Sequence, residues 1–335
     1  MSQFLGMRQF GSLLDERTEV RKSNKDNLVP FGVSYLDDAL EGILPNDLIL
    51  ITAPSGVGKT ELVAQIALNA AKKNKKIYFL ALETYKGEVE ERLFYKGCVQ
   101  KFYLDPHRSA GVPDYLKWAH GKQEDLLQKY YEETKTELSV FRDNITLLDG
   151  GDDFGIEDFE KIFTQAAVAD RADLVILDHL HYMEAQDENE NKFHKQALKK
   201  MQEMVKRHGV PMLLVAHIRK RDRKQKIVAP GMEDIHGSSD IFKMATKMIS
   251  IAKAPADKDS KTLFPTYFRT AKVRYGGGRD QFIGVCAYDV TRNDYLPDYN
   301  VGRLSSAEDD VELLEGPDRP HWFRDSKLRL LQGAK

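Results

Sequence analysis

The chain has 335 residues, of which 41% are apolar and 30% are charged, a balance that excludes wholesale disorder and fits a folded globular protein. At about 150 residues per domain, this length allows two domains or one large α/β domain with appendages. Fifty basic against fifty-two acidic residues give a formal charge of −2, so any surface for nucleic acid has to be local. The two cysteines exclude a disulfide scaffold and indicate a reducing compartment.

Membrane and export signals are missing from the sequence. No stretch approaches about 18 consecutive apolar residues. Residues 1–5 lack the basic-then-apolar layout that opens a signal peptide. We therefore expect a cytoplasmic protein with no membrane partner.

Composition divides the chain into three parts. Residues 1–27 are polar, with apolar positions at a weak helical spacing, and are expected to form an arm or linker, a frayed terminus being the alternative. Residues 28–300 are expected to form the main domain, with a partly helical insertion at about 96–143. Residues 301–335 are expected to be a loosely structured tail, first acidic and then basic.

The main domain alternates short apolar runs with segments of helical spacing, such as 61–73 and 193–205. This alternation predicts an α/β fold, a mainly parallel sheet with helices on both faces. Strands are expected at 47–52, 76–82, 145–148, 174–178 and 210–216. Antiparallel strands added to the sheet edge are expected at 247–251, 267–273 and 282–288.

A glycine-rich turn after the first strand carries the strongest functional signal. The segment Ala53-Pro-Ser-Gly-Val-Gly-Lys-Thr60 matches a phosphate-binding loop, except that alanine stands at the first glycine position. Its glycines allow N–H groups to point at phosphate oxygens, and the following helix adds its positive end. Lys59 can reach the β- and γ-phosphates, and Thr60 can ligate Mg²⁺. The residues predicted to bind ATP are Pro54, Ser55, Gly56, Val57, Gly58, Lys59, Thr60 and Glu61.

Three strand-ending side chains are candidates for the chemistry of hydrolysis. Asp178 ends a strand on the same sheet edge as the loop, which favours a Mg²⁺ ligand. Glu83 ends the second strand and could polarise the attacking water, with Glu184 and Glu190 as weaker candidates. His217 ends the fifth strand and could hydrogen-bond the γ-phosphate.

The loop after His217 is strongly basic, which suits binding of a nucleic-acid backbone beside a nucleotide sensor. A solvated charge run is the alternative. The predicted DNA-binding residues are Arg219, Lys220, Arg221, Arg223, Lys224 and Lys226.

Lys272 and Arg274 alternate along an expected strand, so both side chains point the same way. Two cations on one strand face could stabilise transition-state charge on a phosphate, as an arginine finger does. A basic strand face without that role is the alternative.

Several motifs occur in an order that indicates a family. They are Leu82-Glu83, Ile176-Leu-Asp-His-Leu180, Val215-Ala-His217, Asp234-Ile-His-Gly-Ser-Ser-Asp240 and Ala271-Lys-Val-Arg274. This order resembles the C-terminal motor domain of DnaB-type replicative helicases over about residues 28–290. It is closest to phage primase-helicases and the mitochondrial replicative helicase, which use histidine at the sensor position. Ala53 departs from the family pattern.

The resemblance implies a RecA-like P-loop NTPase with a twisted central sheet, assembled as a homo-oligomeric ring, usually hexameric, around single-stranded DNA. It implies that Glu83 activates water, that Thr60 and Asp178 hold Mg²⁺, and that His217 senses the γ-phosphate. Lys272 and Arg274 would act in trans on a neighbour's ATP, and the segment 219–235 would face the channel. The N-terminal arm would dock on the next subunit. As a departure from the family, we expect no room before residue 28 for a primase or a full N-terminal collar domain.

We therefore predict an ATP-dependent DNA helicase or translocase of the replicative ring type, in a bacterial or phage-infected cell or an organelle matrix. A recombination ATPase that forms filaments on DNA is one alternative, and an ATP-switched assembly or regulatory protein is the other. Primase, polymerase or single-strand-binding protein are candidate partners of the tail, although a solvated tail explains its charges equally well.

Overall fold

Ten strands form one mixed sheet in the computed structural model, which describes residues 28–151, 154–183, 190–217, 228, 230–231, 243–256, 260–274, 278–307 and 310–324. Six of these strands are mutually parallel: Leu48–Ala53 (β1), Ile77–Ala81 (β2), Ile145–Asp149 (β3), Leu174–Asp178 (β4), Met212–His217 (β5) and Lys247–Lys253 (β6). Four antiparallel strands extend the sheet: Leu263–Val273 (β7), Ile283–Asp289 (β8), Asp294–Leu304 (β9) and Val311–Leu313 (β10). Their order across the sheet is β10-β9-β8-β7-β6-β1-β5-β4-β2-β3.

The central strands are apolar throughout because both of their faces are buried. In β1, Ile49 and Ile51 pack into one core, whereas Leu48 and Leu50 pack into a second core on the other side of the sheet. This follows from the two-residue period of a strand, which sends successive side chains to opposite faces.

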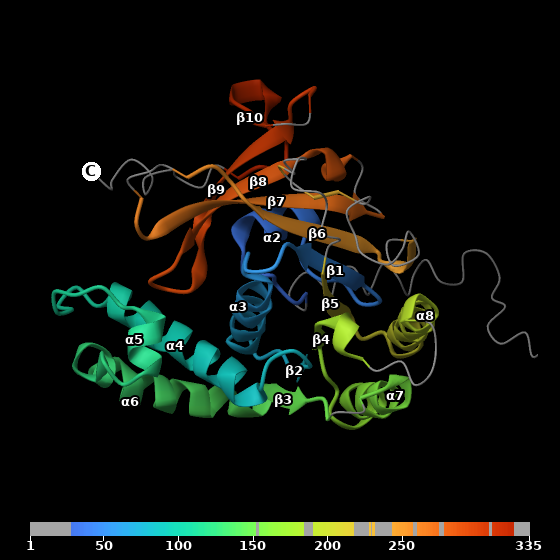
Figure 1. Ribbon diagram of the computed structural model, residues 1–335, viewed down its shortest axis with the longest axis horizontal. Coiled ribbons are helices and arrows are strands. Elements are labelled where there is room, and N and C mark those ends of the chain that lie inside the picture. Colours follow the sequence, from blue (N-terminus) through green and yellow to red (C-terminus); the bar gives the residue numbers. More distant parts are fainter. Residues whose placement is uncertain are drawn as a thin grey trace, which may run out of the picture.

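Helices cover both faces of the sheet (Figure 1). The first core takes residues from two helices, Ser34–Leu40 (α2) and Lys59–Ala71 (α3). The second core takes residues from Ile156–Thr164 (α7) and Glu190–His208 (α8). Short helical segments occupy residues 142–144, 165–169, 180–182, 279–281 and 316–318. The predicted fold class, a mainly parallel sheet between helices with antiparallel strands added, is confirmed.

The chain segment that connects β2 to β3 forms a separate layer of three helices: Lys86–Leu104 (α4), Tyr115–Ala119 (α5) and Glu124–Phe141 (α6). They enclose their own small core, which includes Tyr95, Phe102, Leu127 and Tyr130. The region expected as a partly helical insertion at 96–143 is thus helical over most of its length, and its first helix begins ten residues earlier, at Lys86.

Two expectations about the C-terminal half are wrong. The segment that begins at Lys247 was expected to be antiparallel, but β6 pairs in parallel with β1, and antiparallel pairing starts only with β7. The start of the tail is also ordered, because β9 runs to Leu304 and pairs with β10. Trp322 packs edge-on against Tyr35 and Phe282, which fixes this segment on the main core.

The N-terminal arm expected at residues 1–27 lies outside the described residues. Among the residues that are described, no helix is both long enough and apolar enough to cross a membrane.

Candidate active site

The loop between β1 and α3 has the backbone of a phosphate cradle. Gly56 and Gly58 adopt positive φ angles of 73° and 96°, a conformation that costs L side chains energy but not glycine. A Cβ atom on Gly58 would lie 3.1 Å from the hydroxyl of Tyr295, so space is also restricted there. Helix α3 begins directly at Lys59. Its free N–H groups and positive end therefore point into the loop, where an anion is favoured.

The ammonium group of Lys59 is held over this loop. Its Nζ donates to the carbonyl oxygens of Ala53 at 3.2 Å and Pro54 at 3.4 Å. Burial lowers the pKa of Lys59, and the nearby carboxylates of Glu83 and Asp178 act in the opposite direction. The side chain is thus placed to exchange carbonyl contacts for phosphate oxygens.

Thr60 and Asp178 place two oxygen atoms that could bind a metal ion side by side, next to the phosphate cradle. The Thr60 hydroxyl donates to Asp178 Oδ2 at 2.9 Å. Burial raises the pKa of Asp178 to about 6, and the Thr60 hydrogen bond opposes this rise. Among the described residues, Asp178 Oδ1 is buried and accepts no hydrogen bond, and its neighbour is His179 Nε2 at 3.5 Å. A hydroxyl and an incompletely satisfied carboxylate fit Mg²⁺, which prefers oxygen ligands.

Glu83 meets two histidines at the carboxyl ends of neighbouring strands. Its carboxylate oxygen Oε2 is in direct contact with His179 Nε2, and the rings of His179 and His217 have centroids 4.3 Å apart. One ligand atom from each of Glu83, His179 and His217 lies within 4.8 Å of the others. Burial lowers the pKa of His179 to about 3, so this ring is neutral at physiological pH.

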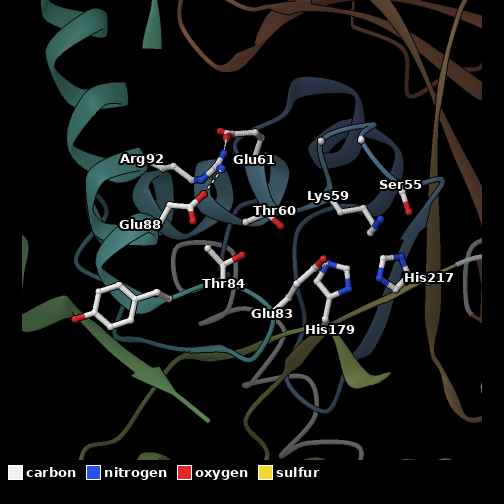
Figure 2. A pocket seen from close by; sticks show the side chains of 13 residues that line it. Ser55, Lys59, Thr60, Glu61, Glu83, Thr84, Glu88, Arg92, His179 and His217 are labelled. Atoms are coloured by element: carbon white, nitrogen blue, oxygen red, sulfur yellow. Dashed lines mark hydrogen bonds and ion pairs between the residues drawn. The ribbon is translucent and has the colours of Figure 1, made fainter. Parts of the chain in front are cut away.

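Apart from the fully buried Asp178, these groups line one cavity of about 420 Å³, a volume within the usual range for small-ligand sites. Figure 2 shows Lys59, Glu83, His179 and His217 together on one side of it. The described residues that line it are Ser55, Gly56, Gly58, Lys59, Thr60, Glu61, Glu83, Thr84, Tyr85, Glu88, Arg92, His179 and His217.

The other side of the cavity holds an ion-pair network that was not predicted from the sequence (Figure 2). Arg92 pairs with Glu61 and, at 2.6 Å, with Glu88. Lys96, which is fully buried, lies 2.9 Å from Glu61 Oε2 and 3.2 Å from Asp294 Oδ1. Glu61 was predicted to bind ATP, but its carboxylate is engaged by these cations and holds α3 against α4 and β9. The four-residue spacing of Glu88 and Arg92, which favours an ion pair on one helix face, is the sequence signal from which the Arg92–Glu88 pair could have been predicted.

Lys272 and Arg274 lie at the opposite end of the parallel strands from the cradle, near the start of β1. Val273 pairs with Lys247, which in turn is level with Ile49 near the start of β1, whereas the cradle follows the end of β1. Lys272 Nζ and Arg274 Nη2 both donate to the carbonyl oxygen of Lys243, at 3.3 and 3.4 Å. Arg274 lines a separate cavity of about 290 Å³.

The structure thus gathers most of the predicted catalytic and nucleotide-binding residues and separates two of them. Lys59, Thr60, Glu83, Asp178 and His217 converge, whereas Lys272 and Arg274 do not reach the same cavity. Pro54 and Val57 belong to the cradle through their backbone but do not line the cavity. Outside the described residues are Glu184 and the predicted DNA-binding Arg219, Lys220, Arg221, Arg223, Lys224 and Lys226.

Comparison with known proteins gives a curated relative and several structures of the same fold. The replicative DNA helicase DnaB of Mycoplasma genitalium is 23% identical over 256 residues, which cover 72% of this chain and 51% of that protein. The chain therefore spans about half the length of that relative. A solved ATPase domain superposes with a TM-score of 0.68 at 17% identity, covering 86% of this chain and 99% of that one. A solved DnaB-like replicative helicase superposes with a TM-score of 0.67 at 17% identity, covering 87% of this chain and 67% of that one.

The match that decides the family covers most of the chain. Residues 29–280 correspond to the family described as the DnaB-like helicase C-terminal domain. They contain the cradle, the Thr60–Asp178 pair and Glu83, and also Lys272 and Arg274. The chain belongs to the DnaB-like helicase C-terminal domain family.

Proposed function

We propose that this protein is an ATP-dependent DNA helicase or translocase of the replicative ring type, which hydrolyses ATP between subunits to move on single-stranded DNA. The observation that supports this most is the division of catalytic groups between two edges of one sheet. The cradle, the Mg²⁺ donors and Glu83 lie at one edge, and Arg274 lies at the other.

ATP is the substrate that the cavity suits. The backbone N–H groups of the loop and the start of α3 bind the phosphates, and Lys59 neutralises their charge. Thr60 and Asp178 would hold Mg²⁺, which when bound neutralises charge on the β- and γ-phosphate oxygens. The buried Asp178 carboxylate is suited to this, because its second oxygen accepts no hydrogen bond from the described residues.

Glu83 acts as the general base in this proposal. Its side chain is 35% exposed, so it can meet a water molecule at the cavity while one carboxylate oxygen contacts His179. His217 lines the same cavity and contacts the γ-phosphate, so it distinguishes ATP from ADP.

Lys272 and Arg274 complete the active site of a neighbouring subunit. A copy that places its Arg274 edge against the cradle edge of the next copy makes a head-to-tail interface, and such interfaces close into rings when the rotation allows. The cation then stabilises charge that develops on the transferred phosphoryl group. We propose a hexamer, as the family resemblance implies.

Single-stranded DNA is the proposed polymer, bound by the basic segment that follows His217. One of the structural relatives is a DnaB-like replicative helicase described together with its interactions with primase. By analogy, primase is a candidate partner here, with polymerase and single-strand-binding protein as others.

Strand displacement by the full chain tests this function. We expect ATP hydrolysis that single-stranded DNA stimulates, and ATP-dependent separation of a forked duplex. Stimulated hydrolysis without displacement would favour a filament-forming recombination ATPase, and electron microscopy of the complex would then show filaments rather than rings. Neither hydrolysis nor salt-sensitive DNA binding would indicate a regulatory protein instead.

A further inference from the structure

His179 occupies the space between the proposed base and the proposed phosphate sensor. It follows Asp178 at the end of β4, and its side chain is 3% exposed. Glu83 reaches it from the loop after β2, and His217 reaches it from the end of β5. Each of these two neighbours lines the cavity, so His179 connects two groups that meet the nucleotide.

We propose that His179 is a positioning residue: its Nε2–H holds the carboxylate of Glu83, and its ring contact with His217 makes the orientation of that carboxylate depend on the γ-phosphate. This inference rests on the proposed function, because it assigns Glu83 as base and His217 as sensor. It adds a connection between them, carried by a side chain that contacts both.

The contact between His179 Nε2 and Glu83 Oε2 determines which parts of the two groups remain available. In the proposed arrangement Nε2–H donates to this one carboxylate oxygen, and the other oxygen is left for the attacking water. His179 Nδ1 is buried without a hydrogen-bond partner among the described residues. A neutral ring that donates at Nε2 and carries a lone pair at Nδ1 satisfies this arrangement.

The second half of the connection is steric. The His179 and His217 ring centroids are 4.3 Å apart, which is van der Waals contact, with the rings inclined at 42°. A movement of His217 toward a phosphate therefore displaces or releases the His179 ring. Because that ring is enclosed, its movement is transmitted to the hydrogen bond with Glu83.

The backbone at this position is consistent with a functional constraint. His179 has φ of 77° although it is not glycine, a conformation that costs energy and occurs often at functional sites. Glutamine and leucine are both unbranched at Cβ, so the two replacements meet a similar backbone cost at this positive φ. They therefore differ mainly in what their side chains can donate.

The test compares His179→Gln, whose amide nitrogen can replace Nε2, with His179→Leu, which keeps the bulk without a donor. Steady-state ATP hydrolysis and binding of a fluorescent ATP analogue are measured on the full chain. For H179L we expect kcat to fall by about 100-fold, with the analogue's Kd changed by less than about threefold. For H179Q we expect kcat within about fivefold of wild type.

Three outcomes overturn the proposal. One is H179L that keeps kcat within about threefold of wild type, and another is H179Q that loses as much as H179L. The third is loss of analogue binding in both, which would indicate a purely structural residue. If the unaltered protein binds no analogue and hydrolyses no ATP, the proposed function itself fails, and this is distinguishable from the three outcomes above.

A double-mutant cycle tests the contact with His217. If the two rings act as one device, H179L combined with His217→Leu lowers kcat no further than the more damaging single substitution. If the residues act independently, the two reductions multiply, which would refute the connection while leaving a role for His179 at Glu83.

Discussion

The two ends of the parallel strands, here called the two edges of the sheet, contain similar features but differ in the chemical groups that line their cavities. Each edge has a cavity, of about 420 Å³ after the carboxyl ends of the strands and about 290 Å³ at the opposite edge. Each also has a buried lysine in an ion pair, Lys96 with Asp294 and Lys247 with Asp47. Only the first edge combines a glycine cradle, a buried unsatisfied carboxylate oxygen and two strand-end histidines among the residues described.

The direction of strand β7 produces this difference. Because β7 runs antiparallel to β6, its last residues emerge beside the start of β1, far along the strands from the cradle. Under the proposed function, one copy of the chain carries two complementary parts of an active site at opposite ends of the parallel strands. We therefore propose that the catalytic unit is the junction between two copies, and the predictions below test each end separately.

Substitution of the cradle lysine has the largest expected effect. Lys59→Ala removes the cation that faces the phosphates, so we expect ATP hydrolysis to fall by about 1000-fold or more. Lys73→Ala, at an exposed position just past the end of α3, is the matched control and is expected to leave the rate unchanged. Undiminished hydrolysis in K59A would refute the assignment of this edge.

Loss of the base comes next. Glu83→Gln keeps the size of the side chain and can still accept from His179, but it is a poor base, so kcat is expected to fall by about 100- to 10,000-fold. Binding of an ATP analogue, measured by fluorescence, is expected to stay close to wild type. If kcat also stays close to wild type, another group activates the water.

The two buried lysines give a third test, one that separates stability from activity. Lys96→Met and Lys247→Met each leave a buried carboxylate without its cation, at an expected cost of about 3–5 kcal/mol in the free energy of unfolding. Urea titration measures this cost. Only K96M is expected to raise the KM for ATP, because Glu61 follows Thr60 directly in α3. An equal rise in K247M would contradict the separation of the two edges.

Removal of one hydroxyl has the smallest expected effect. Tyr295 Oη donates to the Val57 carbonyl oxygen across 3.4 Å, a long hydrogen bond that braces the cradle from β9. Tyr295→Phe is expected to lower the free energy of unfolding by about 0.5 kcal/mol and to change the KM for ATP by less than about twofold. A large change in KM would mean that β9 shapes the cradle more than its contacts indicate.

The sequence allowed prediction of the groups whose position follows from strand periodicity. Asp178 and His217 end apolar runs, so their placement at the cradle edge needed only the rule that parallel strands end together. The cradle was recognisable because its two glycines and its lysine lie within four successive residues, 56–59. The parallel pairing of β6 was not predictable, since its burial pattern is that of any core strand.

Contacts between distant segments were also missed. The Lys96–Asp294 pair joins residues 198 positions apart in the chain, and no local pattern reports it. The connection from Glu83 through His179 to His217 depends on the order of β2, β4 and β5 across the sheet. The strand order across a sheet is a property of packing, and the residue spacing along the chain does not determine it.

A complementation assay tests the shared active site most directly. E83Q and Arg274→Ala are each expected to be nearly inactive alone, because one lacks the base and the other the trans-acting cation. Mixed before assembly, they form some junctions that join an intact Glu83 to an intact Arg274, and we predict recovery of up to about a quarter of the wild-type rate. Full activity of R274A alone, or no recovery in mixtures shown to co-assemble, would contradict the account.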